Sequence, residues 1–247
     1  MRWQDRIAHP LRTDPDGGLV AERDGRVIGI AQAMVRERLW CLSMLAVQPG
    51  VQSAGAGRAL LSAALDYGTD ADAGLIVSSN DPRALRLYAR AGFSLRPAFN
   101  AEGTIDRRAL PTADGEVTDA ELADLPSLAA ISRDVRGGPH TAELESALRW
   151  GARLLRADDR GFAVTMPRQG LWLLVARDEG AARSLLWRSL DLAGDAERPA
   201  VRWITGGQDW AIDVAVRAGL RPSAYGALCV RGDPGPLWPF VPSGPFA

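Results

Sequence analysis

The sequence contains no lysine, so all 29 of its basic residues are arginine. This composition is typical of a GC-rich genome, and it excludes lysine-based catalysis and any modification of lysine. Cysteine is nearly as scarce, because only Cys41 and Cys229 are present, far apart and each inside an apolar run. Their separation gives neither a disulfide framework nor a metal-ligand spacing. We therefore expect both cysteines to be small buried hydrophobic residues, and we expect no metal site.

Long hydrophobic runs and a strong net charge are also missing. The formal net charge is −1, which provides no basic field for nucleic acid and no acidic solvating tail. Apolar runs such as residues 171–176 are far too short to span a bilayer. Residues 1–18 have no apolar core of the kind found in signal peptides. We expect a soluble, cytoplasmic protein without a nucleic-acid or membrane partner; the sequence leaves the oligomeric state open, a homodimer included.

The first part of the chain predicts a mixed α/β unit. Apolar runs at 19–22 and 27–35 flank Asp24-Gly25, which is a strong hairpin signal. Proline at 82 suits the first turn of a helix, and glycine at 92 suits its end. The other elements expected in this part are strands at 39–47, 74–78 and about 95–99, and helices at 57–67 and 82–90.

A second unit is expected after a polar stretch at 100–115, which we interpret as a linker. Thr118-x-x-Glu121 has the capping-box pattern and predicts a helix at 118–133. The proline-rich tail at 232–247 is expected to be an extended, partly packed arm. The remaining elements expected here are helices at 141–150, 180–192 and 209–217, and strands at 153–156, 162–166, 171–176, 201–204 and 223–230.

The two halves of the chain repeat each other. The segment YARAGF at 88–93 matches AVRAGL at 215–220, and each segment follows a short strand and a polar turn. Such a repeat favours two copies of one fold. The alternative is chance similarity between two alanine- and arginine-rich helices. The matching order of elements before each helix argues against this alternative.

The most informative stretch, residues 42–61, has the pattern of a strand, a tight turn and the start of a helix. It contains Val47-x-Pro49-x-x-Gln52-x-x-Gly55-x-Gly57, followed by Arg58. Such a loop presents consecutive backbone N–H groups to an anion at a helix N-terminus, and its glycines let a phosphate approach the backbone. The spacing is neither the P-loop pattern nor the dinucleotide fingerprint. We predict that a phosphorylated cofactor binds here.

A second motif follows the next expected strand. It consists of Asn80, then Ala84 and Tyr88 on a helix, then Gly92-Phe93. The two motifs, in this order and with a strand between them, resemble the signatures of the GNAT family of N-acetyltransferases. The resemblance covers roughly residues 18–97. It implies an α/β fold with a mixed sheet, present here as tandem GNAT-like copies, and acetyl-coenzyme A as co-substrate.

The resemblance also implies where the cofactor lies. Two parallel strands, at 39–47 and 74–78, splay apart, and the pantetheine arm bonds to backbone groups at Leu45, Ala46 and Val47. A backbone N–H group there can polarise the thioester carbonyl. Asn80 corresponds to the family asparagine that contacts the cofactor arm, and it is also a good N-cap residue. The residues implied for the pyrophosphate are Gln52, Ser53, Ala54, Gly55, Ala56, Gly57 and Arg58.

Three further roles rest on this resemblance. Arg83 and Arg90 could reach the 3′-phosphate of the cofactor, or they could form only a solvated helix face. Tyr88 is the expected catalytic residue, because a phenol stays protonated at neutral pH and can donate a proton to the departing thiolate. Its alternative role is packing. The general base stays open between Glu22, Glu37, the two histidines (His9 in an N-terminal arm, and His140) and water.

The second half departs from the family pattern. The equivalent loop at 175–183 lacks the proline, glutamine and paired glycines, and its Asp178 and Glu179 would repel a pyrophosphate. Ala215 stands at the tyrosine position. We interpret this half as a degenerate copy without a cofactor site. The first half departs too, because only about 17 residues precede its first expected strand, where the family has a strand and two helices that wall the acceptor site.

We therefore predict three parts: a catalytic first unit at 1–105, a degenerate second unit at 115–231, and the tail at 232–247. The expected reaction is acetyl transfer by direct attack, from acetyl-coenzyme A to a primary amine of a small molecule, with a protein N-terminus or side chain as the alternative acceptor. The alternative is a non-catalytic acyl-coenzyme A sensor or scaffold. Because the first unit is short, we expect the second unit to complete the acceptor site through an apolar contact, with Trp238 and Phe240 of the tail packed against one unit.

Overall fold

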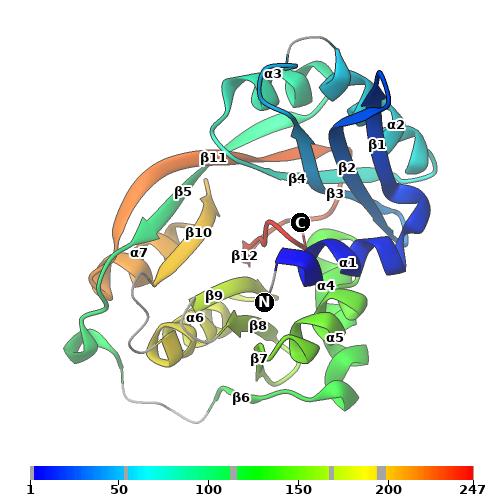
Figure 1. Ribbon diagram of the computed structural model, residues 1–247. Helices are drawn as coiled ribbons and strands as arrows, with labels where there is room; N and C mark the ends of the chain where they lie inside the picture. Colours follow the sequence, from blue (N-terminus) through cyan, green and yellow to red (C-terminus); the bar gives the residue numbers. More distant parts are fainter. Residues whose placement is uncertain (1–2, 53–54, 112–115, 167–169, 194–198, 247) are drawn as a thin grey trace.

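The computed structural model describes residues 3–52, 55–111, 116–166, 170–193 and 199–246. Two β-sheets face each other, with helices on their outer faces and the C-terminal end of the chain between them (Figure 1). Among the described residues, no helix is both long and apolar enough to cross a membrane.

The larger sheet has seven strands in the order β1-β2-β3-β4-β11-β5-β10. All its neighbours are antiparallel except β3 and β4, which are parallel. The strands expected in the first half are therefore all confirmed. Their bounds are β1 (Gly18–Arg23), β2 (Arg26–Arg36), β3 (Leu39–Val47), β4 (Ala73–Ser78), β5 (Ser94–Glu102), β10 (Ala200–Thr205) and β11 (Arg221–Arg231).

The smaller sheet has five strands in the order β12-β9-β8-β7-β6, all antiparallel. Its first strand in this order comes from the tail, so that part of the tail is regular structure rather than an irregular arm. The bounds are β6 (Thr118–Asp119), β7 (Arg153–Ala157), β8 (Gly161–Met166), β9 (Gly170–Ala176) and β12 (Phe240–Val241).

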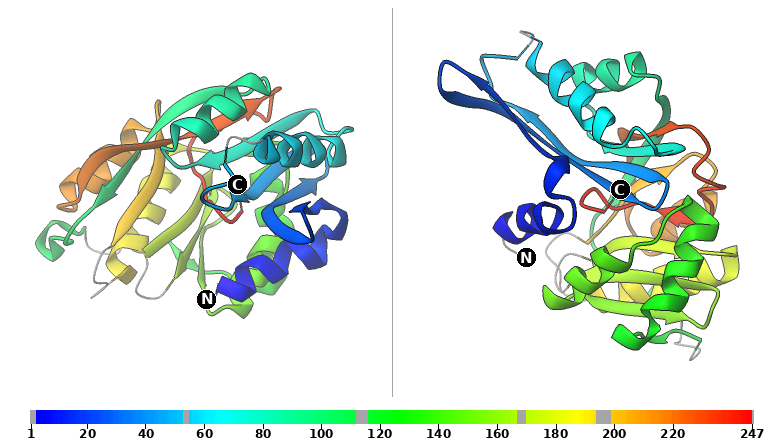
Figure 2. Two further views of the ribbon diagram at one scale, coloured as in Figure 1. Left: turned by 45° about the horizontal axis from the view of Figure 1, so that its top comes forward. Right: turned by 90° about the vertical axis from the view of Figure 1, so that its right-hand side faces the viewer.

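The helices cover the outer faces and the junction between the sheets. Helices α2 and α3 lie on one face of the larger sheet, and α1 lies on the other face, toward the second sheet (Figures 1 and 2). The α-helices are α1 (Trp3–Thr13), α2 (Ala56–Tyr67), α3 (Pro82–Arg90), α4 (Leu125–Arg136), α5 (Thr141–Arg149), α6 (Glu179–Ala193) and α7 (Asp209–Arg217). The short 3₁₀ helices are η1 (Pro15–Gly17), η2 (Arg107–Ala109) and η3 (Leu122–Asp124).

The two halves exchange their last strands. In each half a strand, a helix and a strand follow in order: β4-α3-β5 in the first and β10-α7-β11 in the second. Strand β11 lies between β4 and β5, and β5 lies between β10 and β11. The same arrangement therefore occurs twice in one continuous sheet, which is the tandem architecture that the repeat predicts.

The core between the sheets also joins the halves. Met34, Leu39 and Leu75 of the larger sheet pack in one cluster with Leu128 of α4 and Phe162 of β8. The expected apolar contact between the units is thus confirmed. Burial of this surface stabilises both units together, because apolar surface removed from water contributes in proportion to its area.

The tail packs against this core. Phe240 is 1% exposed and belongs to the cluster, as predicted. Trp238 is 41% exposed, and its indole N–H group donates to the Gly207 carbonyl at 3.0 Å. The side chain of Gln208 holds the tail, because its Nε2 donates to the Leu237 carbonyl and its Oε1 accepts from the Phe240 N–H group.

Two sequence expectations differ from the structure. The helix expected at 118–133 begins only at Leu125, after the short strand β6 and η3. The capping box is formed by Glu121 and Asp124, and Pro126 occupies the first turn of α4, where a missing N–H group costs nothing. The expected N-terminal arm is instead helix α1, which packs on β2 and α5. Both cysteines are buried, as predicted.

Candidate active site

Strands β3 and β4 part in the middle of the larger sheet. Their parallel pairing runs from Leu39 and Ala73 to Leu42 and Ile76 and then stops. Strand β3 continues to Val47 in contact with β2, across a register shift at this level. The two strands therefore leave an opening between them, which is the splay that the family resemblance predicts.

Backbone N–H groups of β3 face this opening. The Gln48 N–H group donates to the Ile28 carbonyl at 2.8 Å, toward β2. Because successive residues of a strand direct their N–H groups to alternate sides, those of Leu45 and Val47 point toward the opening. The side chains of both residues are partly buried, and Ala46 between them is exposed. A ligand lying in the opening would meet these two donors.

The N-terminus of α2 lies beyond the end of β3. Gly55 is its N-cap, with a φ of 91° that favours glycine, and no side chain caps the helix. The first intrahelical bond runs from the Ala59 N–H group to the Gly55 carbonyl, so the N–H groups of Ala56, Gly57 and Arg58 precede it. The first turn contains no acidic residue. These donors and the helix dipole suit an anion.

Gln52 ties the loop to the neighbouring elements. Its Nε2 donates to the Val47 carbonyl at 3.1 Å, and its Oε1 accepts from the Arg83 guanidinium of α3. The structure thus brings the two sequence motifs into contact at one place. Ser53 and Ala54, also expected here, lie outside the described residues.

Asp81, rather than Asn80, caps α3. Its carboxylate accepts from the Arg83 N–H group at 2.9 Å and from the Arg83 guanidinium at 2.8 Å. The Arg83 side chain lowers the pKa of Asp81 to about 2. Asn80 is exposed beside this cap, so its alternative role as N-cap residue is wrong. Arg58 and Arg90 are exposed as well.

Tyr88 lies under α3, in the core on the helical face of the larger sheet. It is 5% exposed and packs in one cluster with Leu42, Ile76 and Cys229. Burial raises the pKa of Tyr88 to about 12. The hydroxyl therefore stays protonated, but full transfer of its proton to a thiolate of ordinary pKa near 8.5 is unfavourable. Its chemistry is better described as hydrogen-bond donation to a developing thiolate.

Most of the candidate bases are engaged elsewhere. Glu37 lies in a turn and forms an ion pair with Arg133 at 2.7 Å. His140 is buried, with its Nδ1 2.9 Å from the Ser132 hydroxyl, and burial lowers its pKa well below its ordinary value. Glu22 is exposed and lines an open groove of about 550 Å³ that also touches Gly55.

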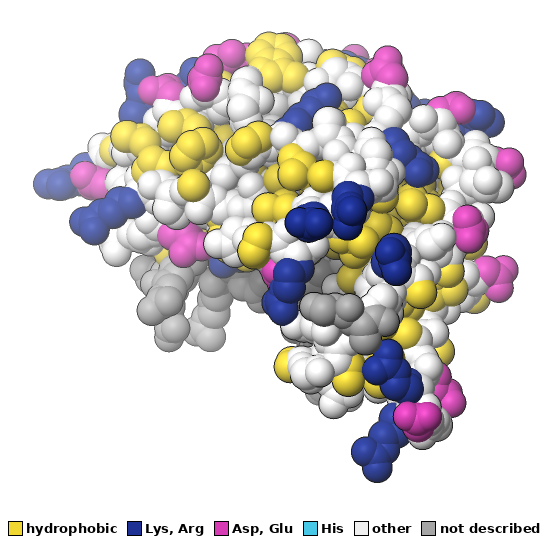
Figure 3. Space-filling model, turned by 90° about the horizontal axis from the view of Figure 1, so that it is seen from above, with side chains coloured by type: hydrophobic (Ala, Val, Ile, Leu, Met, Phe, Trp, Pro, Cys, Tyr) yellow, Lys and Arg dark blue, Asp and Glu magenta, His cyan; other side chains and the backbone are white. Residues whose placement is uncertain are grey.

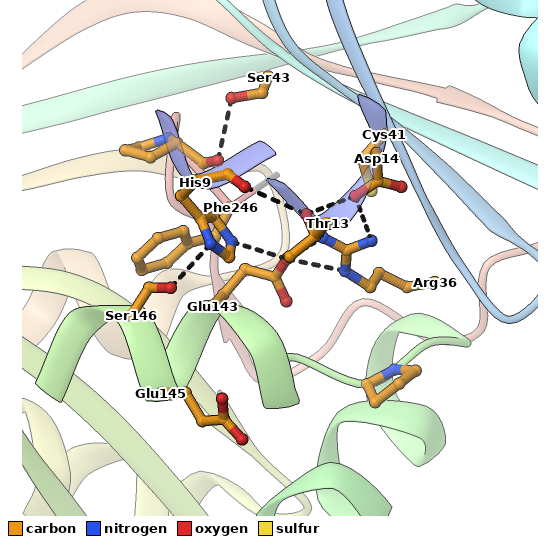
Figure 4. Close-up of polar contacts among 12 residues, drawn as sticks. His9, Thr13, Asp14, Arg36, Cys41, Ser43, Glu143, Glu145, Ser146 and Phe246 are labelled. Atoms are coloured by element: carbon orange, nitrogen blue, oxygen red, sulfur yellow. Dashed lines mark hydrogen bonds and ion pairs between the residues drawn. The ribbon is translucent and has the colours of Figure 1, made fainter. Parts of the chain in front are cut away.

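His9 belongs to a buried polar cluster that joins α1, β2 and α5 (Figure 4). Its Nδ1 lies 2.7 Å from the Ser146 hydroxyl and its Nε2 lies 3.5 Å from the Glu143 carboxylate. Arg36 donates to Glu143 at 2.8 Å and to Asp14 at 2.8 Å. No sequence motif marks this cluster, because its members meet only through tertiary packing.

In the second half, the helix that corresponds to α2 is α6, and a side chain caps its N-terminus. Asp178 precedes α6, and its Oδ1 accepts from the Ala181 N–H group at 2.9 Å. Arg160 pairs with the same carboxylate and lowers its pKa to about 2. A carboxylate of the chain thus occupies the place of an anion. Ala215 is fully buried at the position that corresponds to Tyr88.

No cluster of three or more His, Cys, Asp or Glu side chains that could hold a metal occurs in the part of the chain that the structure describes.

Comparisons with known proteins agree with this geometry. Residues 1–93 match the acetyltransferase (GNAT) family. A mycothiol acetyltransferase of Acidimicrobium ferrooxidans is 40% identical over 88 residues, covering 32% of this chain and 28% of that protein. One of Streptomyces griseus is 37% identical over 95 residues, covering 36% of this chain and 31% of that protein. The matched segment is thus less than a third of the length of either relative.

Solved structures match over nearly the whole chain. An acetyltransferase structure from Pyrococcus horikoshii has a TM-score of 0.79 at 17% identity, covering 97% of this chain and 83% of that one. A tandem GNAT protein from the clavulanic acid biosynthesis pathway has a TM-score of 0.58 at 15% identity, covering 94% of this chain and 88% of that one. These likenesses show the fold.

Proposed function

We propose that this chain transfers an acetyl group from acetyl-coenzyme A to a primary amine of a small molecule. In this proposal the first unit is a GNAT acetyltransferase and the whole chain has a tandem GNAT fold. The observation that carries the proposal is the N-terminus of α2, which has free N–H groups, no capping side chain and no acidic residue in its first turn. It stands at the mouth of the opening between β3 and β4.

The cofactor binds in two stretches. The pyrophosphate lies at the N–H groups of Ala56, Gly57 and Arg58, where Gly55 lets the backbone approach it. The pantetheine arm runs along β3 and bonds to Leu45 and Val47. Arg83 and Asn80 lie beside this path at the start of α3, where the arginine supplies positive charge to the phosphates.

The amine attacks the thioester carbonyl directly. The N–H group of Leu45 or Val47 stabilises the negative charge that develops on the carbonyl oxygen. Tyr88 donates a hydrogen bond to the departing thiolate, which water then protonates. Water also takes the proton from the amine, since Glu37, His9 and His140 are engaged in contacts between other elements. The remaining candidate, Glu22, lines a groove of β1, β2 and α2 that, among the described residues, includes none of β3 or β4.

The second unit contributes structure and acceptor contacts but no chemistry. Asp178 fills its helix terminus and Ala215 stands where a tyrosine would donate. The mycothiol acetyltransferases match about a third of this chain, over less than a third of their own length. Their acceptor therefore does not decide the acceptor of this protein.

Binding of acyl-coenzyme A without transfer is the competing function. One contact favours this competing function. Ser43 lies where β3 leaves β4, and its hydroxyl donates to the Pro245 carbonyl at 3.1 Å. The tail therefore covers part of the opening. Release of the coenzyme A thiol from acetyl-coenzyme A, measured against aromatic, sugar and aliphatic primary amines, separates the two. Amine-dependent release supports acetyl transfer, whereas tight binding without release with any amine supports the competing function.

A further inference from the structure

Trp203 has an unusual backbone conformation. Its φ is 52°, in a region that a bulky aromatic residue rarely adopts. The pairing of β10 with β5 shifts register around it, between Val201 and Ile204. The conformation is held by the buried Asn100, whose Oδ1 accepts from the Trp203 N–H group at 3.1 Å. Such outliers and bulges gather at functional sites, where they redirect a side chain.

The redirected indole reaches the end of β4. Its Nε1 donates to the Ser78 carbonyl at 3.2 Å, although β11 and β5 separate the two strands in the sheet. Strand β11 also bends here, with a register shift between Ala224 and Ala227. Gly226 makes the bend feasible, because a Cβ atom at this position would lie 2.0 Å from the Ser78 carbonyl oxygen.

Two aromatic rings meet at this bend. Trp203 and Tyr225 form an edge-to-face pair with ring centroids 6.1 Å apart. Neither is fully buried, in contrast to Trp40 and Trp210, which belong to the core. The pair therefore keeps part of its surface available to a ligand.

The tail completes the surroundings of the pair. A Cβ atom at Gly244 would lie 3.1 Å from the Trp203 ring, so the backbone of the tail passes close to the indole. The next residue, Pro245, accepts the hydrogen bond from Ser43 on β3. Contacts thus run from the end of β4 to Trp203, on to the tail, and back to β3. They enclose the side of the opening that faces away from α2 and α3.

We propose that Trp203 and Tyr225 form the wall of the acceptor site and bind a primary amine that an alkyl arm joins to an aromatic ring. This proposal rests on the proposed function, because it assigns the acceptor to that same site. The indole N–H group of Trp203 already donates to the Ser78 carbonyl, which leaves the ring faces and edges as the main contacts. Such surfaces suit an aromatic body, whereas an amino sugar needs several hydrogen-bond partners.

The direct test is fluorine NMR of the protein labelled with 5-fluorotryptophan. The Trp203 signal is assigned by its loss in Trp203→Phe, and the Trp238 signal by its loss in Trp238→Phe. The Trp238 signal serves as the control, because this tryptophan lies exposed in the tail. Tyramine added in the presence of coenzyme A should shift the Trp203 signal in a saturable way and leave Trp238 unmoved. No shift at Trp203, or a saturable shift with glucosamine and none with tyramine, would overturn the proposal.

Kinetics provide the second readout. In Tyr225→Leu the KM for tyramine should rise at least about tenfold, while the KM for acetyl-coenzyme A stays unchanged, because the cofactor contacts lie on β3 and α2. Acetylation of tyramine with an unchanged KM in this variant would refute the wall but not the proposed function. A saturable Trp203 shift without any acetylation would refute the proposed function but not the wall.

Discussion

At the scale of single residues, the two halves differ most in what stands at one helix terminus. Gly55 leaves the N-terminus of α2 open, while Asp178 places a carboxylate at the N-terminus of α6. The side chain thus takes the hydrogen bonds that a phosphate would otherwise receive. A glycine at one terminus and an aspartate at the other therefore leave the first helix, and not the second, without a capping side chain.

Tyr88→Phe should lower kcat and leave cofactor affinity nearly unchanged. The substitution keeps the ring in its buried position but removes the hydroxyl that meets the departing thiolate. Assistance of this kind is worth about 10²–10⁴ in rate, and we expect kcat to fall within this range. Steady-state kinetics with the identified acceptor, together with calorimetry of coenzyme A binding, measure the two effects. An unaltered kcat would make Tyr88 a packing residue only.

Residue patterns predicted the turn and the two helices that meet at the candidate site, and the reason is local. The glycines, Gln52 and Tyr88 lie within a turn or a helix whose geometry the neighbouring sequence sets. Trp203 was not predicted, because its role depends on Asn100 and Ser78, which are remote in the chain. The sequence pattern allows Asn80 as an N-cap of α3, whereas Asp81 forms the cap, because both residue types suit that position.

At the scale of elements, helix α1 is held against β2 and α5 by hydrogen bonds and ion pairs between buried polar side chains as well as by apolar contacts. Burial would raise the pKa of Glu143, but hydrogen bonds from His9 and Arg36 overcome this effect and hold the pKa below its ordinary value. Asp14 holds the other side of the Arg36 guanidinium. The cluster therefore joins α1 and the start of the first unit to α5 of the second. The sequence predicts an N-terminal arm in place of α1.

Glu143→Gln should destabilise the protein by about 1.5–3 kcal/mol, because Arg36 and His9 lose a charged hydrogen-bond partner while Asp14 still pairs with Arg36. Glu145→Gln is the matched control on the same helix: its carboxylate points away from the cluster (Figure 4), is 46% exposed and pairs with Arg149 at 3.7 Å. A surface pair of this kind contributes about 0–1 kcal/mol. Urea unfolding of both variants measures the difference. Equal, small effects would show that the cluster does not fix α1.

The free energy of unfolding should also decrease as the pH is lowered, because of His140 as well as Glu143. Both pKa values are lower in the folded chain, so the unfolded chain binds more protons and loss of stability accompanies acidification. The loss begins below the ordinary pKa of 6.5 for His140 and continues below 4.5 for Glu143.

His140→Asn separates the two contributions. The asparagine side chain can still bond to Ser132 but does not titrate, so the drop in Tm between pH 7.5 and 5.5 should be smaller in this variant. Thermal unfolding followed by circular dichroism measures the drop. The same drop in both proteins would show that His140 is not its source.

At the scale of the whole molecule, the two halves share the larger sheet. Strand β11 of the second half fills the space between β4 and β5, and β5 does the same between β10 and β11. The sequence predicted the repeat and the individual strands but not this exchange. Strand periodicity specifies which face of a strand is buried, not which partner it pairs with. Figure 3 views the molecule from the side on which α2 and α3 cover this sheet, where apolar side chains are visible between charged ones.

Residues 1–110 alone should not give a stable, active protein. Without β11, strands β4 and β5 expose unpaired edges, and Met34, Leu39 and Leu75 lose their partners from the second half. We expect this fragment to be insoluble or inactive when expressed alone, and solubility to improve when residues 116–247 are co-expressed. A soluble fragment with full acetyltransferase activity would show that the second half is dispensable.

The central claim is that one cofactor site per chain lies at the N-terminus of α2. The most direct measurement is calorimetric titration with coenzyme A of the native protein, Gly57→Glu and Gly57→Gln. A Cβ atom at Gly57 would lie 3.6 Å from Val47 and 3.8 Å from Leu87, an ordinary contact, so both variants should fold. We predict a stoichiometry of one, binding abolished by the glutamate through repulsion of the phosphates, and a smaller loss with the glutamine. A stoichiometry of two, or unchanged affinity in Gly57→Glu, would contradict the account.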